Sequence, residues 1–397
     1  MRLTFWREPA FWTFVWIRLA FWALTVLTLL WAPIRGDAIP PFSVHQAHAD
    51  LVFDALTQKD AQWFLHIAQF GYDSSQAPAF FPLFPLIVGG LGRVIGSYLV
   101  AGTLLSLLAA GIGAVLVAWI ARIALGERLA QDSVLYLALY PVSFVFTSAY
   151  SEGLFLALSA GAFAAAMRRR SLLAGVLAAL AVATRLIGIA LVVPLVLLLW
   201  PRNRTSWREL TRPAVALLTV VPIVIYGLYL RAHRHDTLAF LHAHTERQRE
   251  TPRLGPLAGL WDSVDFAAHG AAELIRHLPE RLGAPGGYPL RDQYATWNVT
   301  HFVLLLAALW LTWYAWRRLG PAFGGYSAAI LAIVLATPIE VFPLQGLPRF
   351  LVVDFPLFMA LADLTRNRPR LRTTLFCTFA ATGALAAAAF AHDIWVA

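Results

Sequence analysis

Residues 60–85 read DAQWFLHIAQFGYDSSQAPAFFPLFP, and their placement decides how the rest of the chain is arranged. The first half predicts a short helix with one apolar side and one polar side, which bears Gln62, His66 and Gln69. An amphipathic helix of this kind lies in the membrane interface rather than across the bilayer. The chain then turns at Gly71 and enters a second aromatic stretch. We expect that stretch to lie along the membrane surface as well.

The composition is that of a polytopic membrane protein. Hydrophobic residues make up 59% of the 397 residues and charged residues only 13%, which excludes an ordinary soluble domain. Arg18 interrupts the first apolar stretch and no small-residue cleavage site follows, so this stretch is predicted to be a retained span rather than a signal peptide. The single cysteine, Cys377, excludes an intramolecular disulfide.

Apolar runs of roughly 18–25 residues, the length that a spanning helix needs, predict the membrane spans. They lie near 12–33, 98–121, 132–148, 151–167, 213–230, 300–316, 322–338, 350–364 and 374–391. The run 171–200 is too long for one helix, and Arg185 near its middle predicts two short helices that meet at the outer surface. The sequence therefore predicts an all-α fold of about eleven spans in a single domain, residues 1–397.

Basic residues predict the orientation, because cytoplasmic loops are enriched in Lys and Arg. With a cytoplasmic N-terminus, every basic cluster falls on the cytoplasmic side, provided that 79–96 lies along the outer surface without crossing. These clusters are 168–170, 202–212, 317–318 and 366–372. Two long outer loops result, 35–97 and 232–299, and the second is the expected acceptor side. The net charge of +9 is then explained by the basic clusters of the cytoplasmic side, and no nucleic-acid partner is predicted.

Asp60 is the candidate catalytic base, because it begins the predicted interface helix where water, lipid headgroups and a polar substrate meet. The pattern Thr57-x-x-Asp60 also fits a capping box, in which the carboxylate only satisfies amides at the helix start. His66 likewise fits a solvated helix face. Both interpretations stay open on the residues alone.

Glu152, Arg185 and Arg349 lie at predicted membrane boundaries. A charge at mid-bilayer costs roughly 2.5–3.5 kcal/mol on insertion scales, so such residues face a cavity or a partner. They either pair with one another, as Glu152 with Arg185, or the arginines bind a lipid phosphate through bidentate hydrogen bonds. Asp354, which lies deeper, is the expected buried partner of Arg349.

The second outer loop contains His233-x-His235 and His242-x-His244, which resemble metal ligands. Residues two apart on a helix point in different directions, and no cysteine or zinc-type spacing of acids accompanies them. We therefore predict no metal site and no required cofactor, with a divalent metal as the alternative. Proline and glycine in this loop delimit a short amphipathic helix over 265–282.

Several stretches share residues with one enzyme family. They are 60–72 (DAQWFLHIAQFGY) followed by 79–86 (AFFPLFPL), then 140–141 (YP), 150–156 (YSEGLFL), 183–188 (ATRLIG) and 347–350 (LPRF). In this order they resemble the PIG-V mannosyltransferases, the second mannosyltransferase of GPI-anchor synthesis and its bacterial relatives. The family usually has Trp where Lys59 stands, which affects the expected substrate contacts more than the carboxylate that follows.

The resemblance implies a GT-C fold with interface helices in the first outer loop and an extracytoplasmic active site. Such enzymes transfer a sugar, with inversion, from a polyprenyl monophosphate, and they keep an acidic residue at the position that Asp60 matches. Because the lipid phosphate leaves as a stable anion, the paired carboxylates of a glycosidase are not needed. Arg349 and Arg185 are then expected to bind the donor phosphate. The expected substrate-binding residues are His66, Tyr72, Glu152, Asn298 and Gln345.

The expected function is therefore transfer of a sugar, mannose by the family's name alone, to a hydroxyl of a lipid- or glycan-type acceptor. The abundance of Arg and Ala indicates a bacterial chain, which places it in the inner membrane. The alternative is a lipid or glycolipid transporter or flippase. Inverted repeats and broken helices near mid-membrane would indicate a transporter. The two halves of this chain do not resemble each other, and its polar residues gather at one surface, which favours the transferase.

Overall fold

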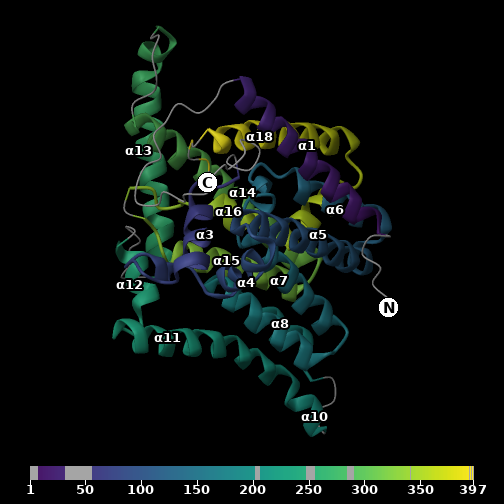
Figure 1. Ribbon diagram of the computed structural model, residues 1–397. Coiled ribbons are helices and arrows are strands. Elements are labelled where there is room, and N and C mark those ends of the chain that lie inside the picture. Colours follow the sequence, from purple (N-terminus) through teal and green to yellow (C-terminus); the bar gives the residue numbers. More distant parts are fainter. Residues whose placement is uncertain are drawn as a thin grey trace.

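The computed structural model describes residues 8–31, 56–201, 206–246, 255–283, 290–339, 341–392, 394 and 396. These residues form helices joined by turns, with no β-strand among them (Figure 1). The predicted outer loops fall partly outside the described residues, at 35–55, 247–254 and 284–289.

Most of the predicted spans correspond to helices. These helices are α1 (Pro9–Trp31), α5 (Tyr98–Leu125), α6 (Glu127–Leu139), α7 (Glu152–Met167), α8 (Ser171–Thr184), α9 (Val192–Leu199), α11 (Val221–Arg234), α14 (Leu290–Arg318), α15 (Pro321–Leu335), α17 (Phe355–Thr365) and α18 (Pro369–Ala391). Within the described residues, five helices are long and apolar enough to cross a membrane. They are α1, α5, the continuous run Arg212–Arg234, Gln293–Arg318 of α14, and α18. The chain is thus an integral membrane protein, and the count of about eleven spans stays a prediction.

Shorter helices connect and flank these elements. They are α3 (Asp60–Phe70), η2 (Ala77–Ala79), α4 (Leu83–Ile95), η3 (Ser143–Phe146), η4 (Leu186–Leu191), α10 (Trp207–Leu210), η5 (Arg212–Val220), α12 (Ala239–Glu246), α13 (Pro256–Gly283) and α16 (Leu347–Val352). The break predicted at Arg185 is present, since α8 ends at Thr184 and a 3₁₀ turn follows. The amphipathic helix predicted over 265–282 is longer than expected and begins at Pro256.

Two predicted spans are interrupted, and proline is involved in each. The run 132–148 leaves the α-helical conformation after Leu139, because Pro141 follows and cannot donate a backbone N–H. The run 350–364 is divided between α16 and α17, and Pro356 occupies the first turn of α17. Proline is tolerated there because the first-turn amides have no partner within the helix.

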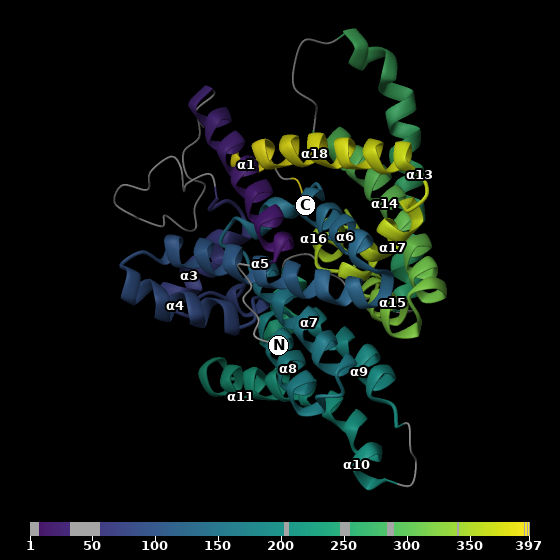
Figure 2. The same ribbon diagram turned by 90° about the vertical axis from the view of Figure 1, so that its right-hand side faces the viewer.

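The two predicted interface helices form α3 and α4, which lie side by side and pack against α5 (Figures 1 and 2). Helix α4 has 13 residues, which makes it about 20 Å long at 1.5 Å per residue. That is shorter than the roughly 30 Å hydrocarbon core, and the position of α4 along the outer surface stays a prediction. It ends at Gly96, whose φ of 83° is the left-handed conformation that glycine adopts readily.

Helices α5 and α7 approach each other closely in the centre of the protein, and glycine makes this approach possible. A Cβ atom on Gly153 would lie 2.3 Å from the backbone carbonyl oxygen of Ser106. On α5, a Cβ on Gly113 would lie 2.8 Å from Cγ of Leu156. Small residues at such crossings let membrane helices pack backbone to backbone. This contact fixes the start of α7, the helix that begins with Glu152.

Replacing Gly153 with alanine is therefore expected to lower the free energy of unfolding by about 1–3 kcal/mol, the usual cost of overpacking a tight contact. Thermal unfolding in detergent measures the change. The matched control is Gly90→Ala on α4, since nothing lies within 4 Å of a Cβ built at Gly90. Equal Tm values for the two variants would contradict the close contact between α5 and α7.

Candidate active site

Four charged side chains converge from segments that are far apart in the sequence. Asp60 is the first residue of α3 and Glu152 the first residue of α7. Arg185 lies in the break between α8 and η4, and Arg349 lies in the short helix α16. All four positions are at helix ends or in short helices, where the chain turns. Side chains at such positions can meet beside the helix bundle rather than inside it.

Arg349 is the centre of this cluster. Its Nη1 atom donates to Oδ2 of Asp60 at 2.6 Å. Its Nε and Nη2 atoms both donate to Oε1 of Glu152, at 2.9 and 2.6 Å. Arg185 approaches the same oxygen, with 2.5 Å between its Nη1 and Oε1 of Glu152. One carboxylate oxygen thus holds two guanidinium groups. The contact between Glu152 and Arg185, one of the two alternatives that the sequence left open, is present, and phosphate binding by the arginines stays a prediction.

The two carboxylates differ in exposure. The side chain of Glu152 is fully buried, whereas that of Asp60 is 25% exposed. A buried carboxylate is costly unless it is paired, which accounts for the two arginines around Glu152. The second oxygen of Glu152, Oε2, is buried without a hydrogen-bond partner in the described part of the chain. Asp60 is therefore the carboxylate that a substrate in solution or in the lipid interface can reach.

Aromatic rings lie against both arginines. The ring of Tyr150 lies 4.7 Å from the guanidinium carbon of Arg349, and the ring of Phe350 lies 5.5 Å from that of Arg185. Both are cation–π distances. Burial alone would lower the pKa of Arg349, but the carboxylates of Glu152 and Asp60 outweigh burial and raise this pKa above its ordinary value. Arg349 is consequently a permanent cation.

The backbone before Asp60 has an unusual conformation. Lys59 has φ 59° and ψ −123°, a region that residues other than glycine rarely occupy. The Tyr150 hydroxyl donates to the carbonyl of Gln58 at 3.2 Å and ties this segment to α7. Helix α3 begins only at Asp60, and the residue before it makes no side-chain cap. A capping box that starts the helix at Thr57 is therefore wrong.

His66 and Tyr72 stabilise the turn that follows α3. His66 Nε2 lies 2.8 Å from Oδ1 of Asp73. The Tyr72 hydroxyl donates to the carbonyl of Phe80 at 2.9 Å, and its ring packs against Tyr226 of α11 at 5.6 Å. Burial raises the pKa of Tyr72. The contacts described for these two residues lie within α3, within this turn and with α11.

Gln345 lies in the segment that leads to Arg349, and Asn298 of α14 contacts that segment. Asn298 of α14 is 7% exposed, and its amide donates to the carbonyl of Val341 at 3.4 Å. The backbone N–H of Gln345 donates to the carbonyl of Phe342 at 3.0 Å. Both residues therefore help to fix the loop before α16.

The expected pairing of Asp354 with Arg349 is wrong. Asp354 Oδ1 accepts a hydrogen bond from Ser327 of α15 at 2.6 Å, while Arg349 binds Asp60 and Glu152. The reason is the break between α16 and α17. It directs the Asp354 side chain into the core, away from the charged cluster.

The histidines of the second predicted loop make local contacts. His233 Nδ1 lies 2.9 Å from the carbonyl oxygen of Tyr229, and His242 Nδ1 lies 2.6 Å from Oδ2 of Asp236. The hydrogen bond with His242 lowers the pKa of the Asp236 carboxyl. No group of three or more potential metal ligands occurs among the described residues, which do not include the side chain of His244.

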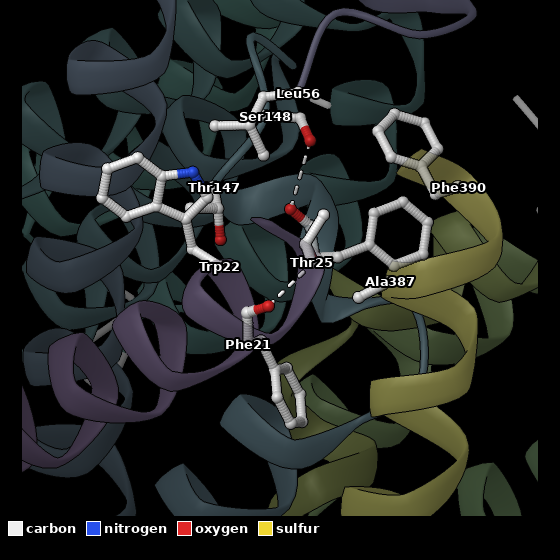
Figure 3. Close-up of a pocket in the computed structure, with 9 residues that line it drawn as sticks. Phe21, Trp22, Thr25, Leu56, Thr147, Ser148, Ala387 and Phe390 are labelled. Atoms are coloured by element: carbon white, nitrogen blue, oxygen red, sulfur yellow. Dashed lines mark hydrogen bonds between the residues drawn. The ribbon is translucent and has the colours of Figure 1, made fainter. Parts of the chain in front are cut away.

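A small pocket lies between α1, η3 and α18 (Figure 3). It has a volume of about 10 Å³, roughly the room that a single water needs. Thr25 and Ser148 point their hydroxyls at backbone carbonyls of Phe21 and Phe144, at 2.8 and 3.4 Å. The Thr147 hydroxyl is buried here without a partner among the described residues. Nothing in the sequence pattern indicated this pocket, which is too small for a lipid chain.

Comparison with known proteins identifies a matching family and solved structures of similar fold. A family model described as Mannosyltransferase (PIG-V) matches residues 13–224. No curated protein matches the sequence. Among solved structures, ArnT from Cupriavidus metallidurans bound to undecaprenyl phosphate is similar, with a TM-score of 0.51 and 17% identity over 93% of this chain and 62% of that one. An oligosaccharyltransferase from Archaeoglobus fulgidus, tethered with an acceptor peptide, has a TM-score of 0.44 and 12% identity over 98% of this chain and 56% of that one.

The chain spans less than two thirds of the length of each of these two proteins. At such low identity the likeness to ArnT shows the fold alone, and it confirms the expected GT-C fold. The family model is the stronger finding, because it matches more than half of the chain and includes Asp60, Glu152 and Arg185. By that match, the chain belongs to the PIG-V mannosyltransferase family.

Proposed function

We propose that this protein is an inverting glycosyltransferase that moves a sugar from a polyprenyl-phosphate carrier to a hydroxyl group of a lipid- or glycan-type acceptor. One observation carries the proposal: the partly exposed carboxylate of Asp60 lies 2.6 Å from an arginine that a buried glutamate holds in place. A base and a phosphate-binding cation are thus adjacent. The undecaprenyl phosphate bound to ArnT supports the same class of carrier.

The proposed reaction is a single displacement. The acceptor oxygen attacks the anomeric carbon from the side opposite the phosphate, which inverts the configuration. The bond between that carbon and the phosphate oxygen breaks, and its electron pair stays on the polyprenyl phosphate. Asp60 takes the proton of the acceptor hydroxyl as the new bond forms. Arg349 and Arg185 bind the departing phosphate, and no cofactor takes part in this step.

The remaining site residues have supporting roles in this proposal. Glu152 holds the two arginines together. Asn298 and Gln345 shape the loop before Arg349, and His66 and Tyr72 shape the turn beyond α3, where sugar and acceptor would be held.

We also propose that the site faces the extracytoplasmic side of a bacterial inner membrane, and the basic clusters, predicted to be cytoplasmic, support this orientation. Mannose is proposed as the sugar on the family's name.

Sugar transfer in proteoliposomes tests the function. The assay supplies labelled polyprenyl-phosphate mannose and a bacterial lipid extract to the wild-type protein and to the Asp60→Asn variant. Label transferred by the wild type alone supports the enzyme, the donor class and the base together. Absence of transfer by the wild type, combined with movement of the labelled lipid between leaflets, would replace the transferase with a flippase.

A further inference from the structure

Besides Glu152, Arg349 binds Asp60 in the structure, and under the proposed function it also binds the donor phosphate. Two of its nitrogens, Nε and Nη2, are bound to the buried oxygen of Glu152, and the third, Nη1, is bound to Asp60. Under the proposed function, the donor phosphate needs this same guanidinium. Glu152 holds the Nε side of the guanidinium, so the base and the donor both need the end that carries Nη1, where Asp60 is bound.

We propose that the donor phosphate displaces Asp60 from Arg349, so that the catalytic base is released only when donor is bound. This inference rests on the proposed function and adds to it the order of events. Donor binding comes first, and activation of the acceptor hydroxyl follows.

Burial determines which of the two carboxylates is displaced from Arg349. The side chain of Glu152 has no exposed surface and contacts both Arg349 and Arg185, so it stays in place when the donor binds. Of the two carboxylates, Glu152 is therefore the one that positions Arg349. Asp60 is 25% exposed and holds Arg349 through one oxygen, Oδ2. Its side chain can turn toward solvent or toward an acceptor. The end of Arg349 that exchanges partners is therefore Nη1.

Charge balance supports the exchange. In the structure the cluster contains two carboxylates and two guanidinium groups, which neutralise one another. A carboxylate that accepts a charge-assisted hydrogen bond from arginine is a weaker proton acceptor, because protonation would cost that bond. Arrival of the phosphate anion adds a negative charge and takes the Nη1 hydrogen bond of Arg349 away from Asp60. Asp60 thereby becomes a stronger base at the moment when the acceptor attacks.

The test is direct binding of undecaprenyl phosphate, which carries the phosphate but no sugar, to purified protein in nanodiscs. The Asp60→Asn variant is expected to bind it about tenfold to hundredfold more tightly than the wild type, because a charge-assisted competitor for Arg349 is removed. Asp60→Glu keeps the negative charge and is expected to stay within about threefold of the wild type. The control is Asp73→Asn, which removes a 50% exposed carboxylate that pairs with His66 beyond the other end of α3.

Each outcome separates this inference from the proposed function. Tighter binding by Asp60→Asn alone supports displacement. Equal or weaker binding by that variant, with clear binding by the wild type, overturns displacement and leaves the transferase proposal intact. If Asp73→Asn also tightens binding, the effect is one of net charge, and displacement is again overturned. If the wild type fails to bind undecaprenyl phosphate, the proposed donor class is wrong.

Discussion

Turnover by the Asp60→Asn variant is expected to be lower than that of the wild type by about 10²–10⁴-fold, the usual contribution of a general base. Asparagine has nearly the same shape as aspartate, and its carbonyl oxygen can still accept the hydrogen bond from Nη1 of Arg349, which is 2.6 Å long in the structure. It cannot take a proton from an acceptor hydroxyl. The loss should therefore appear in kcat, while KM for the donor does not rise.

Initial rates of sugar transfer in proteoliposomes, over a range of donor concentrations, measure both constants. A thermal unfolding curve checks that the variant is folded. The control is Glu127→Gln on α6, an exposed carboxylate that pairs with Arg122 and takes no part in the charged cluster. Wild-type turnover by Asp60→Asn would show that another group takes the proton.

The sequence predicted those parts of the fold and site that depend on local patterns. The break at Arg185 followed from the length of one apolar run, and α3 followed from helical periodicity around Asp60. The pairing of Glu152 with Arg185 was one of two alternatives suggested by the cost of leaving charges alone at a membrane boundary. The break and the helix both depend on residues that are close to one another in the sequence.

The contact between Arg349 and Asp60 could not be predicted in the same way. These residues are 289 positions apart, and no local pattern states which charged residues will meet. The predicted depth of Asp354 in the membrane instead suggested it as the partner of Arg349, but the break between α16 and α17 turns Asp354 toward Ser327. The positive φ of Lys59 could not be predicted from the sequence either, because it results from tertiary contacts such as the hydrogen bond between Tyr150 and Gln58.

Replacing Arg349 is expected to have the second-largest effect, on stability as well as on donor use. Arg349→Ala removes this partner from Asp60 and leaves Glu152 with Arg185 as its ion-pair partner among the described residues. Truncating one member of a buried ion pair typically costs about 3–5 kcal/mol. The remaining contact with Arg185 should keep the loss in unfolding free energy near the lower end of that range.

Because the alanine variant combines two effects, Arg349→Lys separates them. Lysine keeps the positive charge that Glu152 requires, so the Tm should stay close to that of the wild type. Its ammonium cannot reproduce the planar fork that binds Glu152 through two nitrogens and still presents a third. KM for the donor is consequently expected to rise about tenfold, the equivalent of one lost charge-assisted hydrogen bond.

The matched control is Arg276→Ala on α13, where the arginine side chain is 72% exposed and its ion pair with Glu273 is 3.7 Å long. Exposed pairs of this kind contribute little, so neither the Tm nor the donor KM should change measurably. A donor KM for Arg349→Lys equal to that of the wild type would remove Arg349 from phosphate binding. Arg349 would then serve only as the counter-ion of Glu152, and Arg185 would be the remaining candidate to hold the phosphate.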